Sequence, residues 1–261
     1  MSKEKPRRRR VSKLAIAGTA LPLCAVLFLF SSVERALGGL LALSADGAAI
    51  ANYAVALRRE SIKHDVGYVD YAHIPDCLDQ ALISVEDKRF MLHGGIDPIA
   101  LLRVAFEDVE NDRVDHGGST LTLQLARMML HISRHQLTQL AELTSKLRMV
   151  RAALIIEHDF RKQKILELYF NAVYLGRGAT GVAAAAQAYF NRPLRKLNKG
   201  QCVYMAGLPL APARFGADPS GAAAMARYRH VIATMQRNGF LTEQQATAVA
   251  DEPLFSRLST R

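Results

Sequence analysis

The chain has 261 residues, half of which are hydrophobic, and a formal net charge of +10. This length allows one well-buried domain together with a membrane anchor. The charge is uneven: residues 1–13 contain seven Lys and Arg side chains and one glutamate, so +6 belongs to this tail and the remaining +4 is unremarkable. A basic tail can bind nucleic acid, but this one leads directly into an uncharged apolar segment, and we therefore expect no nucleic-acid partner.

Residues 14–33 are predicted to cross a membrane. From Leu14 to Phe30 the chain has seventeen residues without a charge, and a helix needs roughly 17–25 such residues to span the hydrocarbon core. Because basic residues stay on the cytoplasmic side, we expect a cytoplasmic tail at 1–13 and everything after the span outside the cytoplasm. A cleaved signal peptide is the alternative, since small residues near 31–38 are compatible with cleavage.

The three cysteines give no clear pattern. Cys24 falls in the predicted span. Cys77 and Cys202 could in principle pair, but no compact spacing indicates a disulfide framework or a zinc site. Buried free thiols are therefore expected.

A helix that opens at Ile74-Pro75 is predicted to carry a carboxylate pair at its end. Residues 34–75 form a membrane-proximal lead-in before it, in which the charged, β-leaning stretch 58–75 suits a short hairpin or a loop. Glu86 and Asp87 follow the apolar segment of the helix, and Gly94 is expected to close it. A carboxylate in such a half-dry place has its charged form disfavoured, which suits a general base.

A second helix is predicted to begin after the glycines at 117 and 118. Ser119 and Thr120 supply an N-cap, and the helical pattern over 121–130 carries Gln124 and Arg127. Unpaired backbone N–H groups at such a start favour a phosphate through hydrogen bonds and the helix dipole. A base near an anion site indicates sugar or phosphoryl transfer, although each pattern alone is common as solvated charge or as a capped turn.

Between these two patterns, Asp97-Pro98 is typical of a helix start, with the aspartate as N-cap and the proline in the first turn. The helix that it opens, over 96–111, is apolar around much of its girth. Taken alone, this segment reads as an ordinary core helix.

The order and spacing of the two main patterns resemble the first two motifs of the peptidoglycan glycosyltransferases of family 51. These occur as monofunctional transglycosylases and as the N-terminal half of class A penicillin-binding proteins. The residues that carry the resemblance are Glu86-Asp87-x-x-Phe90-x-x-His93-Gly94 and Gly117-Gly118-Ser119-Thr120-x-Thr122-x-Gln124. Later segments, Lys162 to Asn171 and Leu197 to Pro212, fit as well, so the resemblance covers about residues 70–245. It implies a mainly α, lysozyme-like domain of two lobes at 76–250, followed by a tail at 251–261.

The resemblance also implies a reaction and a site. The family joins disaccharide units of lipid II into β-1,4-linked glycan strands and releases undecaprenyl pyrophosphate, at the bacterial inner membrane. It implies Glu86 as the catalytic base and a lipid-dipping role for 96–111. The implied substrate-binding residues are Asp87, Arg89, Phe90, Arg103, Ser119, Thr120, Gln124, Arg127, Lys146 and Arg148. No metal-binding motif is present, but a divalent cation, Mg²⁺ or Mn²⁺, could share the charge neutralisation, and other cell-wall synthesis proteins are candidate partners.

The third motif departs from the family pattern. Ser145 stands where the family has an arginine, and Met149 stands where it has a glutamate, although Glu157 ends the helix at the matching distance. Leu123 and Gln201 replace a glutamine and a glutamate elsewhere. These changes keep open a second hypothesis, a catalytically weak lipid II-binding scaffold, and a third, a lytic hydrolase, is disfavoured because it would not need the whole second motif.

The fourth motif, which begins with Lys162 to Asn171, is expected to be mostly structural. Its apolar residues recur at helical spacing, as in a core helix. Glu167 and Asn171, which lie in this run, are interpreted as structural rather than catalytic.

Overall fold

The computed structural model describes residues 45–63, 67–100, 119–132 and 139–255. The predicted cytoplasmic tail, the predicted span at 14–33 and Arg103 lie outside these residues. No helix within the described ranges is long and apolar enough to cross a membrane. The contacts divide the chain into two units, one of 1–43 with 97–118 and the other of 44–96 with 119–261.

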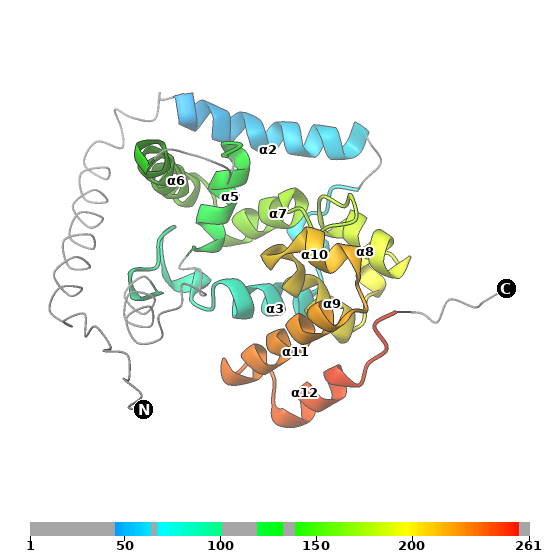
Figure 1. Cartoon of the computed structure of the whole chain (residues 1–261). Helices are drawn as coiled ribbons and strands as arrows, with labels where there is room; N and C mark the ends of the chain where they lie inside the picture. Colours follow the sequence, from blue (N-terminus) through cyan, green and yellow to red (C-terminus); the bar gives the residue numbers. More distant parts are fainter. Residues whose placement is uncertain (1–44, 64–66, 101–118, 133–138, 256–261) are drawn as a thin grey trace, which may run out of the picture. The chain divides into compact units, whose positions relative to one another are not determined.

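The described residues are mainly helical and contain isolated β-bridges but no β-strand, which confirms the predicted mainly α class (Figure 1). The β-leaning stretch 58–75 has helix up to residue 63 and a 3₁₀ turn further on, so no hairpin forms in its described part. The α-helices are α2 (Ala45–Lys63), α3 (Asp76–Glu86), α5 (Leu121–Met129), α6 (Gln139–Asp159), α7 (Lys162–Ala172), α8 (Val182–Phe190), α9 (Lys199–Gly207), α10 (Pro212–Ala217), α11 (Ala222–Arg237) and α12 (Glu243–Ala250). The 3₁₀ turns are η1 (Tyr71–His73), η2 (Phe90–Leu92), η3 (Leu194–Lys196) and η4 (Leu208–Leu210).

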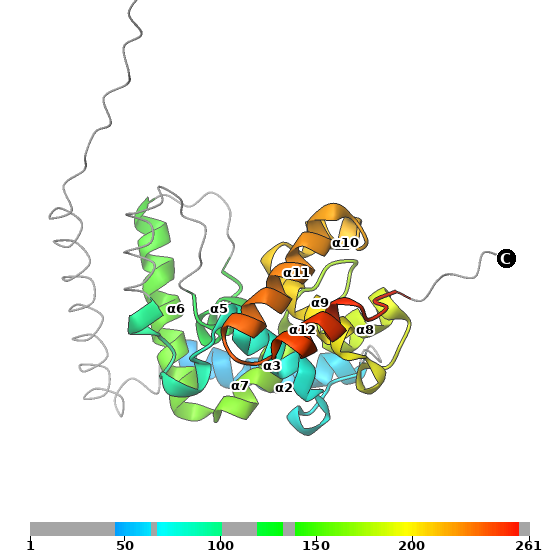
Figure 2. The same cartoon turned by 90° about the horizontal axis from the view of Figure 1, so that it is seen from below.

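Helices α3, α9 and α11 pack against one another in the larger unit (Figure 2). Helix α9 is buried along nearly its whole length, from Gly200 to Gly207. A disulfide between Cys77 of α3 and Cys202 of α9 joins the two helices, with Cα atoms 5.7 Å apart. The expectation of free thiols was wrong, because the pairing of two helices that are 125 residues apart in sequence leaves no trace in the cysteine spacing.

Helix α5 packs against α6 and α7. Its buried face consists of Leu121, Thr122, Leu125, Ala126 and Met129, at the spacing of an amphipathic helix. Every residue of α7 from Ile165 to Ala172 is buried, as the helical apolar pattern of that segment predicted. These two helices place the second motif directly beside the fourth.

Glu167 and Asn171 of α7 hold the segment that precedes α3. The Glu167 carboxylate accepts hydrogen bonds from the Tyr68 hydroxyl at 2.7 Å and the Tyr71 backbone N–H at 3.0 Å. The Asn171 side chain exchanges two 2.8 Å hydrogen bonds with the backbone of Val69. Both contacts agree with the structural role predicted for these residues.

Candidate active site

Helix α3 ends at Glu86, eight residues before the glycine that was expected to close it. Asp87 adopts φ −158° and ψ 70°, which is not helical, and its backbone N–H makes the last bond of the helix, to the Ile83 carbonyl at 3.0 Å. The 3₁₀ turn η2 follows. The early end lets the two neighbouring carboxylates serve two different sets of partners.

The Glu86 carboxylate has one protein donor on each oxygen. Gln124 Nε2 donates to Oε2 at 3.0 Å, and Arg227 Nη2 donates to Oε1 at 3.2 Å. The Glu86 side chain is 14% exposed and that of Arg227 is 13% exposed. The expectation of a half-dry carboxylate therefore holds for its burial, but the group faces a cation that the sequence analysis did not assign to it.

A second layer of contacts fixes these two donors. The Tyr169 hydroxyl donates to Gln124 Oε1 at 3.0 Å, which turns the amide nitrogen toward Glu86. Arg227 Nε donates to the Gly207 carbonyl at 3.1 Å. Burial lowers the pKa of Arg227, and the Glu86 carboxylate opposes this shift by stabilising the charged guanidinium. Five helices, α3, α5, α7, α9 and α11, thus meet at one carboxylate.

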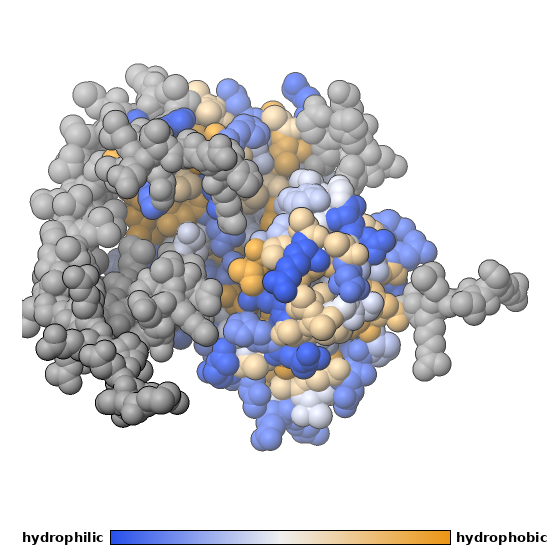
Figure 3. Space-filling model, viewed as in Figure 1, coloured by the Kyte–Doolittle hydropathy of each residue, from blue (hydrophilic) through white to orange (hydrophobic). Residues whose placement is uncertain are grey.

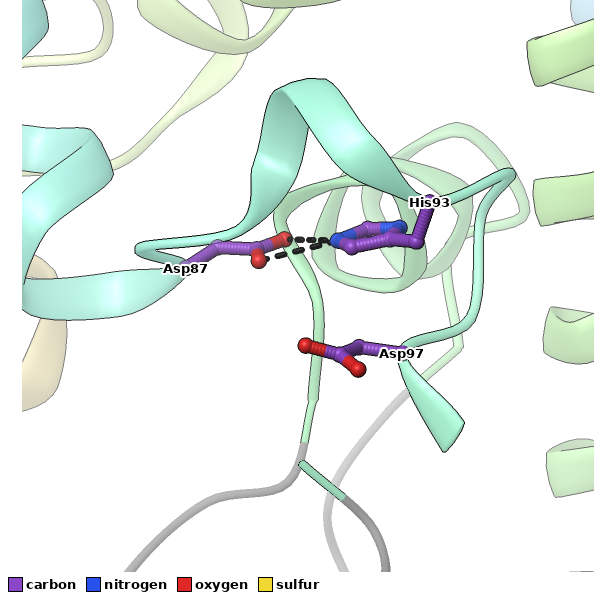
Figure 4. Close-up of side chains that lie close together, drawn as sticks. All are labelled: Asp87, His93 and Asp97. Carbon is purple, nitrogen blue, oxygen red and sulfur yellow. Dashed lines mark hydrogen bonds and ion pairs between the residues drawn. The ribbon is translucent and has the colours of Figure 1, made fainter. Parts of the chain in front are cut away.

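Asp87 has a different surrounding at the start of α5. Its buried carboxylate lies 2.9 and 3.0 Å from His93 Nε2, and it accepts the backbone N–H of Leu121 at 3.1 Å (Figure 4). A negative charge at the first N–H of a helix is favoured by the helix dipole. The Asp87 carboxylate therefore occupies one of the backbone N–H groups that the sequence pattern predicted to bind a substrate phosphate.

Thr120 is the N-cap of α5, as predicted. Its hydroxyl accepts the N–H of Leu123 at 3.1 Å and donates to the carbonyl of Gly95. The cap thus uses another of the N–H groups that were expected to be open. Ser119, the other predicted cap, is exposed.

The loop that ends the first motif is held from α6 and α7. Lys162 Nζ donates to the His93 carbonyl at 2.6 Å and to Glu157 at 2.7 Å, and Glu157 also accepts the Thr122 hydroxyl at 2.6 Å. Gly95 has φ +88°, and a Cβ there would lie 3.0 Å from the Ala153 carbonyl oxygen. Glycine is therefore required where the loop meets α6.

Two predicted substrate-binding residues support this loop instead of facing solvent. Phe90 is fully buried, and Lys162 Nζ lies 4.2 Å from its ring centroid. Asp87 is 8% exposed, with its carboxylate engaged as described above. In this structure both side chains build the first motif, and a direct contact with substrate stays a prediction for them.

The remaining predicted cations among the described residues lie just after α3, on α5 and on α6. Arg89 is half-buried after α3, Arg127 is half-buried on α5, and Lys146 and Arg148 are exposed on α6. All four make polar contacts within the protein. Met149, one residue further along α6, is half-buried.

Arg227 and Tyr169 are the residues of this site that the sequence analysis did not identify. Arg227 lies on the apolar side of α11, between the buried residues Ala224, Tyr228 and Val231. An arginine within the apolar stripe of a helix needs a buried partner, because an unpaired buried charge is costly. That placement was the available signal, whereas its partner, 141 residues away in sequence, could not be inferred from the pattern.

The carboxylates of Asp87 and Asp97 both have hydrogen-bond donors within the protein. The Asp87 oxygens are engaged by His93 and Leu121. Asp97, the third residue labelled in Figure 4, accepts the N–H groups of Ile99 and Ala100 in its own segment, as the predicted N-cap. A metal ion at either carboxylate would have to share or displace these donors.

Comparison with known proteins identifies relatives of this chain. The sequence model of the transglycosylase family matches residues 54–236. Penicillin-binding protein 1A of Aquifex aeolicus is 37% identical over 72% of this chain and 25% of its own length, and that of Pseudomonas aeruginosa is 34% identical over 71% and 22%. A crystal structure of penicillin-binding protein 1A from Haemophilus influenzae matches with a TM-score of 0.34 and 38% identity, over 36% of this chain and 14% of that one.

The chain thus spans about a quarter of the length of these curated relatives. The matched range contains Glu86, Gln124, Tyr169 and Arg227, so the whole contact network around the carboxylate lies inside it. By its sequence, the chain belongs to the transglycosylase family.

Proposed function

We propose that the protein is a peptidoglycan glycosyltransferase that polymerises lipid II into β-1,4-linked glycan strands. The observation that carries the proposal is the Glu86 carboxylate, which is largely buried, fixed by donors from α5 and α11 and located beside the second motif. Family membership supports the reaction class, and the fixed carboxylate supplies the group that the class requires.

In the proposed reaction, Glu86 removes the proton from the 4-hydroxyl of the acceptor sugar, and the oxygen attacks the anomeric carbon of the donor. A base without a covalent intermediate gives a single inversion, as in inverting glycosidases. Each Glu86 oxygen has one protein donor and keeps further acceptor capacity, because a carboxylate oxygen accepts about two hydrogen bonds. The proton therefore has a place to go without the loss of either contact.

The leaving pyrophosphate needs charge neutralisation more than it needs a proton. Arg127 of α5 and Lys146 and Arg148 of α6 are the described cations that we assign to this role, together with Arg103. A divalent cation would have to be held by the substrate, since the carboxylates Asp87 and Asp97 are already engaged. The steps proposed above do not use a divalent cation.

The test is the conversion of lipid II by the purified protein, with polymer detected on a gel. Glu86→Gln keeps the size of the side chain but cannot take a proton, so we expect a loss of about 100- to 10,000-fold in rate with lipid II binding nearly intact. Glu243→Gln, an exposed change on α12, is the matched control and should leave the rate unchanged. A Glu86→Gln protein within a few-fold of the parent would assign the base to another group.

A slow enzyme, or a lipid II-binding scaffold, is the second candidate. It is favoured by Met149, which is half-buried on α6 beside the exposed Arg148 and cannot accept a proton or bind a cation. We propose that polymerisation by the natural protein is slow or needs a partner among other cell-wall proteins. An inert parent that still binds lipid II would select the scaffold.

We propose that the domain works outside the cytoplasm, anchored to the inner membrane by residues 14–33. The Cys77–Cys202 disulfide supports this compartment, because disulfides persist in oxidising surroundings. Figure 3 shows hydrophobic residues interspersed with hydrophilic ones over the visible described surface. Leu92 and Met91, which follow Glu86, are 79% and 48% exposed and offer an apolar contact for a lipid surface.

A further inference from the structure

The Arg227 guanidinium donates hydrogen bonds to two different helices. Its Nε donates to the Gly207 carbonyl at the end of α9, and its Nη2 donates to Glu86 Oε1 at the end of α3. One planar guanidinium therefore connects the backbone of one helix to the carboxylate of another, with fixed geometry at both ends.

The approach of α9 to α11 places the guanidinium. Gly207 is in contact with Arg227: a Cβ at residue 207 would lie 3.1 Å from Arg227 Cγ and 3.3 Å from Val231 Cγ2. The side chain therefore runs across the α9–α11 contact with little freedom before it reaches Glu86. A side chain that is restricted in this way can orient its partner at small entropic cost.

The surroundings of Glu86 show which element contributes which kind of group. α5 contributes the neutral amide of Gln124, which is fixed by the Tyr169 phenol of α7, and Arg127 lies one turn further along α5. α9 contributes the Gly207 carbonyl and α11 contributes Arg227. Among the side-chain contacts that Glu86 makes with described residues, Arg227 provides the charged one.

We propose that Arg227 is a positioning residue that acts through Glu86, by holding the carboxylate at the orientation in which it accepts the acceptor proton. This role rests on the proposed function. It requires no contact between Arg227 and substrate: Gln124 holds one carboxylate oxygen and Arg227 the other, and two anchored oxygens fix the plane of the carboxylate. The loss of either anchor leaves the base present but free to rotate.

The test is a double-mutant cycle on polymerisation of lipid II, with the parent, Glu86→Gln, Arg227→Met and the double variant. A misplaced catalytic group costs roughly 100-fold, so we expect Arg227→Met to lower kcat by about that factor with KM changed by less than about three-fold. In the Glu86→Gln background the same substitution should cost less than about three-fold more, because residues that act as a unit are not additive. Arg227→Lys, which keeps the charge and one donor direction, should recover part of the rate.

Arg229→Met is the matched control, because Arg229 lies on the same helix and is exposed, and it should leave kcat and KM unchanged. Melting temperatures of all variants separate loss of fold from loss of positioning. Multiplicative losses in the double variant, or a loss carried by KM, would show that Arg227 acts on substrate or on the fold, and would overturn the proposal.

An inert parent would refute the proposed function first, and Arg227 would then have no reaction to support. An active parent with multiplicative losses refutes the role of Arg227 alone. The two failures are therefore seen in different proteins of the same experiment.

Discussion

At the scale of residues, the identity of the central groups could be predicted, but their partners could not. Glu86 and Gln124 were identified from motif spacing, and the structure joins them at 3.0 Å. Arg227 and Tyr169 belong to the same network, yet each lies on a helix whose sequence reads as core. A contact between helices that are distant in sequence depends on packing, and a single sequence carries no direct record of packing.

Met149→Glu is the substitution that we expect to raise activity. Met149 is half-buried and stands one position from Arg148 on α6, where a carboxylate would add a charge-assisted partner for the cations of the site. We expect the rate of lipid II polymerisation to rise at little cost in stability, because both side chains suit a helix. Ser145→Arg on the same helix should add to the gain.

Leu147→Glu is the matched control, since Leu147 is 43% exposed on the same helix and receives the same charge at a different angle. It should not raise the rate. Melting temperature and rate are measured together on each preparation. A fully folded Met149→Glu protein with an unchanged rate, beside a robustly active parent, would show that the chain neutralises the leaving group in another way.

At the scale of elements, the start of α5 followed from the sequence, and the end of α3 did not. The start of α5 at Leu121 agrees with the predicted cap, because the signal for a cap is local. The end of α3 was placed eight residues too late, at a glycine. The actual end is set by Asp87, which turns toward Leu121 of another helix, and a tertiary contact of this kind overrides a local terminator.

The contact between the lead-in and α7 should give the protein a defined response to acid. Burial raises the pKa of Glu167, but hydrogen bonds from Lys164, Tyr68 and Tyr71 outweigh it, so the pKa is lowered overall. A carboxyl with a lowered folded-state pKa contributes stability above its unfolded-state pKa and loses it as the pH falls through the folded-state value. We expect Glu167→Gln to flatten the fall in melting temperature between about pH 5 and pH 3.

Asp79, in the same region, has a raised pKa and therefore the opposite effect on stability in acid. Burial, assisted by Asp76, raises its pKa against a hydrogen bond from Tyr71, so protonation of Asp79 stabilises the fold as the pH falls. Asp79→Asn should therefore steepen the fall in melting temperature at low pH, which Glu167→Gln should flatten. Both variants are measured in the same melting series. If melting temperature fell equally steeply with pH in the parent and both variants, these contacts would not be the source of the acid response.

At the scale of the whole molecule, the class and the helical content were predictable, and the covalent cross-link was not. The resemblance to the glycosyltransferase family implied a mainly α domain, and the described residues confirm that they are mainly helical. The Cys77–Cys202 disulfide instead depends on α3 lying against α9. That pairing also brings together the helix that ends at Glu86 and the helix that ends at Gly207, so the cross-link belongs to the framework of the site.

The disulfide should contribute measurably to stability. It closes a loop across 125 residues of sequence, and removal of a native disulfide typically costs about 2–5 kcal/mol, much of it through the unfolded chain. We expect a reducing agent to lower the free energy of unfolding of the parent by an amount in this range. Cys77→Ala, Cys202→Ala and the double variant should show nearly equal losses, because each removes the same single bond.

The reducing agent should have no effect on any of these variants, which makes them the controls for its action on the rest of the chain. In the double variant the second substitution should add little, because the single bond is already absent after the first. Additive losses, together with a parent that does not respond to reduction, would contradict the cross-link. The cysteines would then no longer support an oxidising compartment.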